Sequence, residues 1–340
     1  MKLTWHRRKL RLRHPFNIAR CPRSDETTKE VLLVRIEHDG LAGWGECAPS
    51  AYYHQSLESN KKALAQAAGM LGSDPFALDA ILDPIHERLG HESAAVAAID
   101  AALHDLICQR LGIPVWKYLG LDPSRTPLTS FTIGLDDPDV VARKVHEAES
   151  FPILKVKVGT NEDDAILEAI RRAAPDKTLR VDANGCFSPE NALERCRHLA
   201  RYNLELIEQP TPRGQDKALP SIRAESLVPI IADESCIGTD DVLRCAGVFD
   251  GINIKLSKCG GLRPALQMIH TARSAGLKVM LGCMVETSVG VAAAAQLAPL
   301  ADYLDLDGHL LLADDPFEGI GGQAGLLTLS DRAGLGVVER

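Results

Sequence analysis

The stretch ILKVKVG places two lysines one residue apart, in an alternating pattern of apolar and charged residues. In a β-strand, Lys155 and Lys157 would point to one side, and Leu154, Val156 and Val158 to the other. The lysines could guard an exposed edge strand against aggregation. Alternatively, both could point into an enclosed site. The choice depends on which elements flank this strand.

Acidic residues end three later β-branched runs, each about one strand–helix unit after the last. Asp182 ends LRVD, Glu208 ends LELIE and Asp233 ends IIAD. A single Asp at such a position often caps the next helix, and for Asp233 alone that interpretation is favoured. Three convergent carboxylates, however, repel one another and are costly to bury. Oxygen ligands suit Mg²⁺, so we expect one Mg²⁺ held by these three residues, with Asn184 beside it.

A third lysine, Lys255, ends the run INIK in the same way. A lysine near another lysine and a divalent cation has its charged form disfavoured, so we expect its pKa to fall towards neutrality. Two such lysines on opposite sides of a metal-bound carboxylate could remove and return a proton on opposite faces of one carbon.

Eight short apolar runs after Thr126 are separated by predicted helices. The runs are LTSFTIG, ILKVKVG, TLRVD, LELIE, PIIAD, GINIK, KVMLG and YLDLD. Strand–helix repetition predicts an α/β fold with a parallel sheet, and eight strands favour a closed barrel whose strand ends share one mouth. An open doubly wound sheet is the alternative, but no glycine-rich dinucleotide fingerprint follows any run. In a closed barrel, ILKVKVG has no free edge.

The first 120 residues follow a different pattern. Alternating runs within the first 50 residues predict strands, with a tight turn at Asp39-Gly40. Apolar residues then recur at helical spacing from about Gln55 to Leu119, where Gly112 and Pro114 mark a stop. This part therefore reads as a small α+β domain.

Bulk composition limits the function classes. The chain has 340 residues and a net charge of −8, which argues against sequence-independent nucleic-acid binding. The basic run HRRKLRLR reads as a solvated strand face rather than an anion-binding arm. We see no signal peptide and no apolar run long enough to span a bilayer. Nine cysteines without paired spacing predict reduced thiols in the cytoplasm and no structural zinc.

Several motifs together resemble the enolase superfamily, in its muconate-lactonizing branch. They are KVKVG, VDANG, IEQP, ADES and NIKLSKCGG, preceded by GWGECAP and AAIDAALHDL. The resemblance covers nearly the whole chain. It implies a (β/α)7β modified TIM barrel at residues 121–309 and an N-terminal α+β capping domain at residues 1–120. A C-terminal segment, about 310–340, would complete the capping domain.

Carried over motif by motif, the resemblance implies roles for individual residues. Asp182, Glu208 and Asp233 would hold Mg²⁺. Lys157, the second lysine of KVK, and Lys255, the first lysine of NIKLSK, would be the two acid/base residues. Lys258 is not chosen. Lys155 would lie beside the substrate carboxylate and lower the pKa of its neighbour.

A narrower resemblance is to dipeptide epimerases, in particular those of the L-Ala-D/L-Glu type. It rests on DLDG, in which Asp305 and Asp307 share one face and would hold a free ammonium group. Thr132 is a further candidate for substrate binding. Arg20 and Arg23, in the loop after the Pro-Phe pair, are candidates for binding a glutamate side chain, although ordinary surface arginines fit the pattern equally well. The implied reaction inverts the α-carbon of the C-terminal residue of a dipeptide.

Other functions stay open at this stage. o-Succinylbenzoate synthase, muconate cycloisomerase and N-acylamino acid racemase share the lysines and metal ligands, but their substrates lack a free ammonium. A barrel that binds a carboxylate without turnover is a further alternative. A dehydratase would need a histidine at strand seven or eight, and His309 reads as a loop or surface residue. The expected partner is a small dipeptide, without nucleic acid or membrane, and a homo-oligomer is left open.

Overall fold

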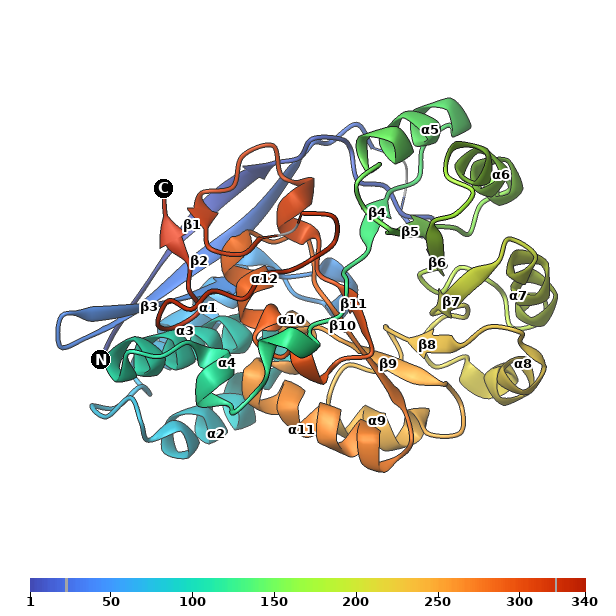
Figure 1. The fold of residues 1–340 in the computed structure, drawn as a ribbon. Helices are drawn as coiled ribbons and strands as arrows, with labels where there is room; N and C mark the ends of the chain where they lie inside the picture. The colour runs from blue at the N-terminus through green and yellow to red at the C-terminus, as the bar shows by residue number, and fades with distance from the viewer. Residues whose placement is uncertain (22–23, 322) are drawn as a thin grey trace.

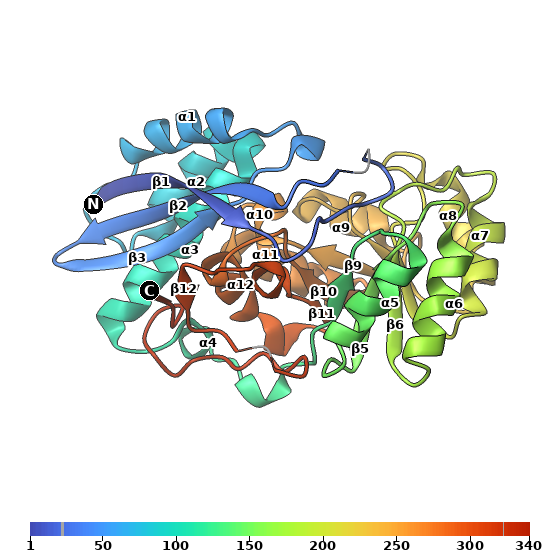
Figure 2. The same ribbon diagram turned by 90° about the horizontal axis from the view of Figure 1, so that it is seen from above.

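The computed structural model describes residues 1–21, 24–321 and 323–340. It consists of an antiparallel sheet covered by helices and a ring of parallel strands surrounded by helices (Figure 1). Seen from above, the antiparallel part and both chain termini lie at one end of the molecule (Figure 2). Each part has a large apolar core of its own.

Three antiparallel strands begin the chain. They are β1 (Lys2–Arg11), β2 (Thr28–His38) and β3 (Leu41–Cys47), and β2 is central. The predicted turn joins β2 to β3, where Asp39 and Gly40 have φ angles of 49° and 79°. Tight hairpins need this left-handed backbone. The basic residues in the middle of β1 are exposed, as a solvated strand face requires.

Four helices follow this sheet: α1 (Leu57–Ala68), α2 (Leu78–Leu89), α3 (Ser93–Leu111) and α4 (Val115–Tyr118). Helix α3 is buried along nearly its whole length and packs directly on β3. A Cβ atom at Gly43 or Gly45 would lie 2.0 or 1.9 Å from the carbonyl oxygen of Ala102 or Ala98. The glycines of GWGEC therefore allow strand and helix backbones to touch.

All eight predicted barrel strands are present and parallel, in chain order around the ring. Their bounds are β4 (Phe131–Ile133), β5 (Ile153–Lys157), β6 (Thr178–Asp182), β7 (Leu204–Glu208), β8 (Ile230–Ala232), β9 (Gly251–Ile254), β10 (Lys278–Gly282) and β11 (Tyr303–Asp305). The first and last strands meet through an isolated bridge between Thr129 and Leu304. In addition, the backbone N–H of Ser130 donates to Leu304 O at 3.2 Å. The predicted barrel is confirmed.

Helices connect the barrel strands and cover the outside of the ring (Figure 1). They are α5 (Pro138–Glu147), α6 (Asp163–Ala173), α7 (Ala192–Ala200), α8 (Leu219–Glu225), α9 (Thr239–Cys245), α10 (Leu256–Cys259), α11 (Leu262–Ser274) and α12 (Ser288–Ala295). Short 3-10 turns lie at Ala51–Tyr53, Gly90–Glu92, Pro123–Arg125, Asp216–Ala218, Ala298–Leu300 and Gly308–Leu311. Among the described residues, no helix is both long enough and apolar enough to cross a membrane.

The chain after the barrel returns to the N-terminal part. It contains the two-stranded ladder of β12 (Phe317–Glu318) and β13 (Val338–Glu339). The Phe317 ring packs edge-on against Trp44 of β3 at 5.1 Å between centroids. The backbone N–H of Leu335 donates to Asp105 of α3 at 2.7 Å. These contacts support our proposal that residues 310–340 complete a capping domain formed by residues 1–120.

Candidate active site

The strand ends bring the predicted acidic residues together at one mouth of the barrel. Asp182 and Glu208 are the last residues of β6 and β7 and pair directly in the ladder. Asp233 follows β8 by one residue, and Asp305 ends β11. All four carboxylates are buried. The ladder register thus places carboxylate groups from separate chain segments around one space.

The two lysines of β5 point into this mouth. Lys155 and Lys157 are only 1% and 7% exposed, and β5 lies between β4 and β6, so the edge-strand interpretation is wrong. Lys155 Nζ lies 2.5 Å from Asp305 Oδ2, 2.7 Å from Glu208 Oε2 and 3.2 Å from Asp182 Oδ2. Lys157 Nζ lies 2.6 Å from Asp182 Oδ2.

Lys255 reaches the same cluster from β9, and its amine lies 2.8 Å from Asp233 Oδ2. Lys258 has a different environment. Its amine donates to Asp233 Oδ1 at 2.6 Å and to the carbonyl oxygens of Asp233, Cys236 and Asn253 at 2.7 to 2.9 Å. Because these contacts use all of its donors, Lys258 holds the backbone, whereas Lys255 lines the cavity.

The charges of the site move several pKa values. Burial opposes the ammonium of Lys155, but the carboxylates of Asp305, Glu208 and Asp182 outweigh it and raise the pKa of Lys155 well above its usual range. Burial also lowers the pKa of Lys255, but the negative charge of Asp233 outweighs it, and the pKa of Lys255 is raised. For the protein groups alone, the pKa values of Lys155 and Lys255 are raised because the carboxylates dominate. The expected lowering depends on a bound cation and stays a prediction.

The acidic cluster has the donor chemistry that a hard divalent cation needs. Burial, and then the charge of Asp182, raise the pKa of Glu208 to about 7, which is the unfavourable repulsion that a cation relieves. Glu208 Oε1 accepts a hydrogen bond from Asn253 at 2.8 Å, whereas its Oε2 accepts none with hydrogen-bond geometry. The side chains are paired with lysines, and no three metal-ligating side chains among the described residues are already grouped around a metal position. The residues present fit Mg²⁺ by charge, burial and donor type.

Asp305, the last residue of β11, and Asp307, two residues later, line the same cavity. Ser130 Oγ donates to Asp305 Oδ1 at 2.8 Å, and the backbone N–H of Thr132 donates to Asp307 Oδ2 at 2.5 Å. Burial and the neighbouring charge of Asp305 raise the pKa of Asp307 to about 7. A cationic group between the two carboxylates would remove that repulsion. His309, just beyond, is buried at 7% exposure, so its interpretation as a loop or surface histidine is wrong as to exposure.

The loop after β1 supplies one of the predicted arginines. Arg20 lines the cavity, forms an ion pair with Glu234 and stacks over Tyr52, with 4.1 Å between its guanidinium carbon and the ring centroid. Arg23 lies outside the described residues. Sequence reasoning missed Glu234, although it directly follows Asp233 in ADES. It also missed Tyr52 and Tyr53, because no local pattern marks a capping loop that reaches the barrel.

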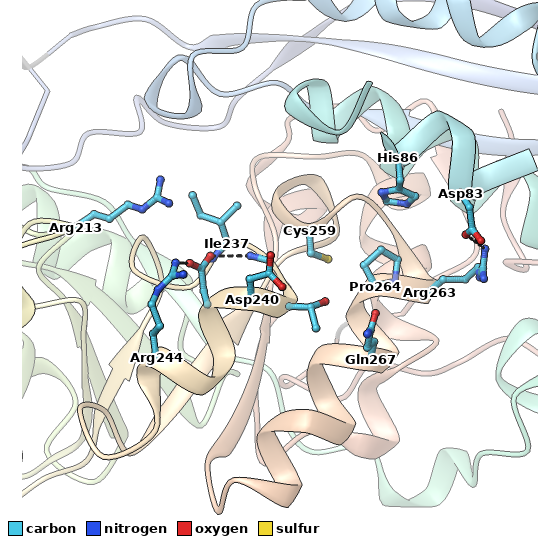
Figure 3. Close-up of a pocket in the computed structure, with 13 residues that line it drawn as sticks. Asp83, His86, Arg213, Ile237, Asp240, Arg244, Cys259, Arg263, Pro264 and Gln267 are labelled. Carbon is cyan, nitrogen blue, oxygen red and sulfur yellow. Dashed lines mark hydrogen bonds and ion pairs between the residues drawn. The ribbon is translucent and has the colours of Figure 1, made fainter. Parts of the chain in front are cut away.

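The cavity that holds these residues has a volume of about 370 Å³. Both domains line it, the capping domain through residues 48–53 and the barrel through the three lysines, Asp233, Asp305 and Asp307. Asp182 and Glu208 are completely buried and are not among the residues that line the cavity. A larger cavity of about 820 Å³ lies where α2 meets α9 and α11 (Figure 3). None of the described site residues lines it, and Arg244 pairs with Asp241 and Arg263 with Asp83 there. The smaller cavity is the candidate active site.

Comparisons with known proteins place this site in a family. Residues 2–120 match the model described as the mandelate racemase/muconate lactonizing enzyme N-terminal domain, and residues 140–339 match that described as enolase C-terminal domain-like. The chain is 41% identical to an L-Ala-D/L-Glu epimerase of Bacteroides thetaiotaomicron, covering 100% of this chain and 88% of the relative. It is 36% identical to a hydrophobic dipeptide epimerase of Roseobacter litoralis, covering 99% of each.

A solved structure shows the same arrangement. The dipeptide epimerase of Enterococcus faecalis V583, complexed with Mg and the dipeptide L-Leu-L-Tyr, superposes with a TM-score of 0.92 at 34% identity. The match covers 99% of this chain and 98% of that one. The capping sheet, the barrel and the motifs that end its strands have a common explanation: the chain belongs to the mandelate racemase/muconate lactonizing enzyme family of the enolase superfamily.

Proposed function

We propose that this protein is a Mg²⁺-dependent dipeptide epimerase that inverts the α-carbon of the C-terminal residue of a dipeptide such as L-Ala-L-Glu or L-Ala-D-Glu. One observation carries the proposal. Lys157 and Lys255 come from different strands and both reach the same acidic cluster, while Asp305 and Asp307 lie in the same cavity. The relatives named as dipeptide epimerases, two of them solved with Mg and a dipeptide of their own, support it.

Asp182, Glu208 and Asp233 are the residues that would hold the cation. When bound, Mg²⁺ supplies fixed positive charge beside the substrate carboxylate, which stabilises negative charge that develops on deprotonation. Lys155, buried beside Glu208 and Asp305, would face the same carboxylate and add a second fixed charge.

The two lysines would move the proton. Nζ of one of Lys157 and Lys255, in its neutral form, accepts the α-proton from one face of the α-carbon. Nζ of the other, in its ammonium form, donates a proton to the opposite face, and the configuration inverts. Each amine then exchanges its proton with water, which restores the starting protonation states. Both side chains line the cavity, where a bound dipeptide would separate them.

Asp305 and Asp307 would bind the free ammonium group of the dipeptide. The neighbouring charge and burial that raise the pKa of Asp307 are the conditions under which a bound cation is favourable. Thr132, which contacts both aspartates, would orient them. N-acylated substrates offer no ammonium at this place, and this distinguishes the proposal from N-acylamino acid racemase, o-succinylbenzoate synthase and cycloisomerase activity.

Arg20 is our candidate for the side chain of the epimerised residue. Arg20 lines the cavity, where its guanidinium is held by Glu234 and Tyr52. A glutamate carboxylate would share this cation with Glu234, whereas an apolar side chain would pack on the tyrosine ring. Arg23 stays a second candidate.

Deuterium exchange tests the proposed function directly. The Mg²⁺-loaded enzyme should exchange the α-proton of the C-terminal residue of L-Ala-L-Glu in D₂O and should interconvert the two epimers. N-Succinylamino acids should be poor substrates. Rapid turnover of N-succinylamino acids without any exchange on free dipeptides would overturn the proposal, and binding without exchange on either would indicate a non-catalytic barrel.

We also propose that the protein works in the cytoplasm without a nucleic-acid or membrane partner. Its net charge of −8 and its lack of paired cysteine spacing support this. Self-association into a homo-oligomer stays a prediction, and size-exclusion chromatography with light scattering would test it.

A further inference from the structure

The segment that follows Lys255 lies against the capping domain rather than against the barrel alone. Residues 256–261 comprise helix α10 and two glycines, and α10 packs on α3 of the capping domain. Ser93 Oγ, at the start of α3, donates to the carbonyl oxygen of Ser257 at 2.7 Å. Helix α3 therefore contacts the backbone two residues after Lys255.

A buried carboxylate of α3 caps the barrel helix that begins after this segment. Helix α11 has Gly261 at its N-cap, which offers no side chain to the first free N–H groups. Asp100 supplies the missing acceptor: Oδ1 accepts from the N–H of Leu262 at 2.7 Å, and Oδ2 from that of Arg263 at 3.4 Å. Asp100 is completely buried, so the helix terminus is one of the groups that stabilise its negative charge.

The two glycines of NIKLSKCGG are explained by this close approach. Gly260 and Gly261 have φ angles of 93° and 126°, which side chains rarely adopt. A Cβ atom at Gly261 would lie 2.4 Å from Cγ of Asp100, and one at Gly260 would lie 2.6 Å from Cε1 of His86. His86 and Asp100 of the capping domain thus occupy the space that side chains at positions 260 and 261 would need.

Neighbouring groups hold both partners of this contact. His104 Nδ1 lies 3.2 Å from Asp100 Oδ1 and 2.8 Å from the Asp100 carbonyl oxygen. Figure 3 shows Arg263, at the start of α11, pointing to Asp83 of α2, and their atoms lie 3.3 Å apart. The start of α11 is therefore fixed to two helices of the capping domain.

We propose that Asp100 is a positioning residue for Lys255, acting through the N-terminus of α11 and the segment between them. Lys258 ties that segment to Asp233 on the barrel side, and Asp100 ties its other end to the capping domain. The contact lies outside the cavity, so Asp100 touches no substrate. The proposal rests on the proposed function, in which Lys255 serves one face of the α-carbon and Lys157 the other.

Exchange of the substrate α-proton with solvent, measured without epimerisation, allows the activity of Lys157 and of Lys255 to be assayed separately. In D₂O, each lysine can exchange the α-proton of the epimer that faces it, and the K255A and K157A variants identify which epimer belongs to which lysine. With Mg²⁺-loaded D100N, exchange of the epimer that faces Lys255 should fall about 10- to 100-fold, the effect of misplacing a reacting group by about an ångström. Exchange of the epimer that faces Lys157 should be nearly unchanged.

Asp105→Asn is the matched control, because Asp105 is a second buried carboxylate of α3. It accepts from the backbone N–H groups of Trp44 and Leu335, both at 2.7 Å, and among the described residues it makes no hydrogen bond or ion pair with α10 or α11. This variant should lose stability without a difference between the two epimers. An equal fall for both epimers in D100N would overturn the proposal.

Backbone amide hydrogen exchange gives a readout that needs neither metal nor substrate. In D100N, protection of residues 256–262 should fall, whereas in D105N it should not. Gly261→Ala disrupts the same contact from the barrel side. If D100N does not fold, Gly261→Ala should show the reduced protection of residues 256–262 in its place. If the wild-type enzyme exchanges neither epimer, the proposed function fails. Unchanged protection of residues 256–262 in D100N would overturn the role of Asp100 in either case.

Discussion

The two sides of the barrel mouth hold their lysines in different ways. On one side, Lys155 and Lys157 lie within β5, and their backbone is paired with β6 residue by residue. On the other side, Lys255 lies one residue beyond the end of β9, and the segment that follows packs on the capping helix α3. The first side is positioned by sheet geometry, and the second by contact between domains.

This difference shows which positions in a barrel active site depend on distant sequence. A residue inside a strand has its direction set by alternation and by the ladder. A residue in the loop beyond a strand has no ladder partner, so other contacts must fix it. We therefore expect changes in the capping domain to affect one half of the chemistry more than the other.

Chelation of the metal should have the largest effect, because the acidic cluster serves both sides of the mouth. EDTA should abolish epimerisation, and added Mg²⁺ should restore it, since three buried carboxylates without a cation cannot favour a bound substrate carboxylate. Circular dichroism before and after chelation is the control for folding. Full turnover in excess EDTA would contradict the Mg²⁺ site.

Replacement of Lys157 or of Lys255 should remove proton transfer at one face of the α-carbon. Lys157→Ala and Lys255→Ala should each lower epimerisation by about 1,000-fold or more, because general acid–base groups contribute roughly 10²–10⁴-fold. Each variant should retain exchange of one epimer only. The epimer ratio is measured by chiral chromatography, and exchange by NMR in D₂O. If either variant interconverts the epimers at the wild-type rate, the two-base mechanism is wrong.

Asp307→Asn tests the ammonium site on the first side. Loss of one charged partner should raise KM for L-Ala-L-Glu about 10- to 100-fold, the value of a hydrogen bond to a charged group, with a smaller change in kcat. Asp302→Asn is the matched control, since Asp302 lies just before the opposite end of β11, bonded to Val279 N–H and Arg273. An equal change in KM for both variants would argue against an ammonium site.

Replacement of Arg20 should have a smaller and substrate-selective effect. Arg20→Met combined with Glu234→Gln leaves no unpaired buried carboxylate. It should lower kcat/KM for L-Ala-L-Glu by about tenfold while leaving L-Ala-L-Leu nearly unchanged, because only the acidic side chain uses the cation. Arg23→Met, made separately, shows whether the second arginine carries the preference. A parallel fall for both dipeptides would remove Arg20 from specificity.

His309 should give the smallest effect, on stability alone. Burial lowers the pKa of His309 to about 4, so the unfolded chain binds the proton more readily. Stability from this group is full above the unfolded pKa of about 6.5 and is lost as pH falls towards 4. Urea unfolding should show wild type losing about 1 kcal/mol more than His309→Leu between pH 7.5 and 5.5. Replacement of the exposed His270 by leucine is the control for the loss of a histidine at the surface. Identical pH profiles for wild type and His309→Leu would contradict the burial argument.

The sequence predicted the positions that lie on strands. Asp182, Glu208 and Lys157 follow from alternation and strand ends, because the barrel ladder then leaves them only one direction. Contacts between domains could not be predicted in this way. Nothing near Asp100 in the sequence indicates Leu262 as its partner, and nothing near Tyr52 indicates Arg20. The raised pKa values that the protein groups alone give Lys155 and Lys255 could not be predicted either, because they depend on how many carboxylates surround each amine in space.

The first and last strands of the barrel, β4 and β11, are joined by an isolated bridge rather than by a continuous ladder. The bridge joins Thr129 to Leu304, and the backbone N–H of Ser130 donates to Leu304 O. Carboxylate side chains add to this junction: Asp307 accepts from the backbone N–H of Thr132, and Asp305 accepts from Ser130 Oγ. These two aspartates thus connect the first and last strands of the barrel, in addition to their proposed role in binding the substrate. Local opening of the barrel would therefore begin at this junction. A substitution of either aspartate would affect both the binding of the dipeptide's ammonium group and the closure of the barrel.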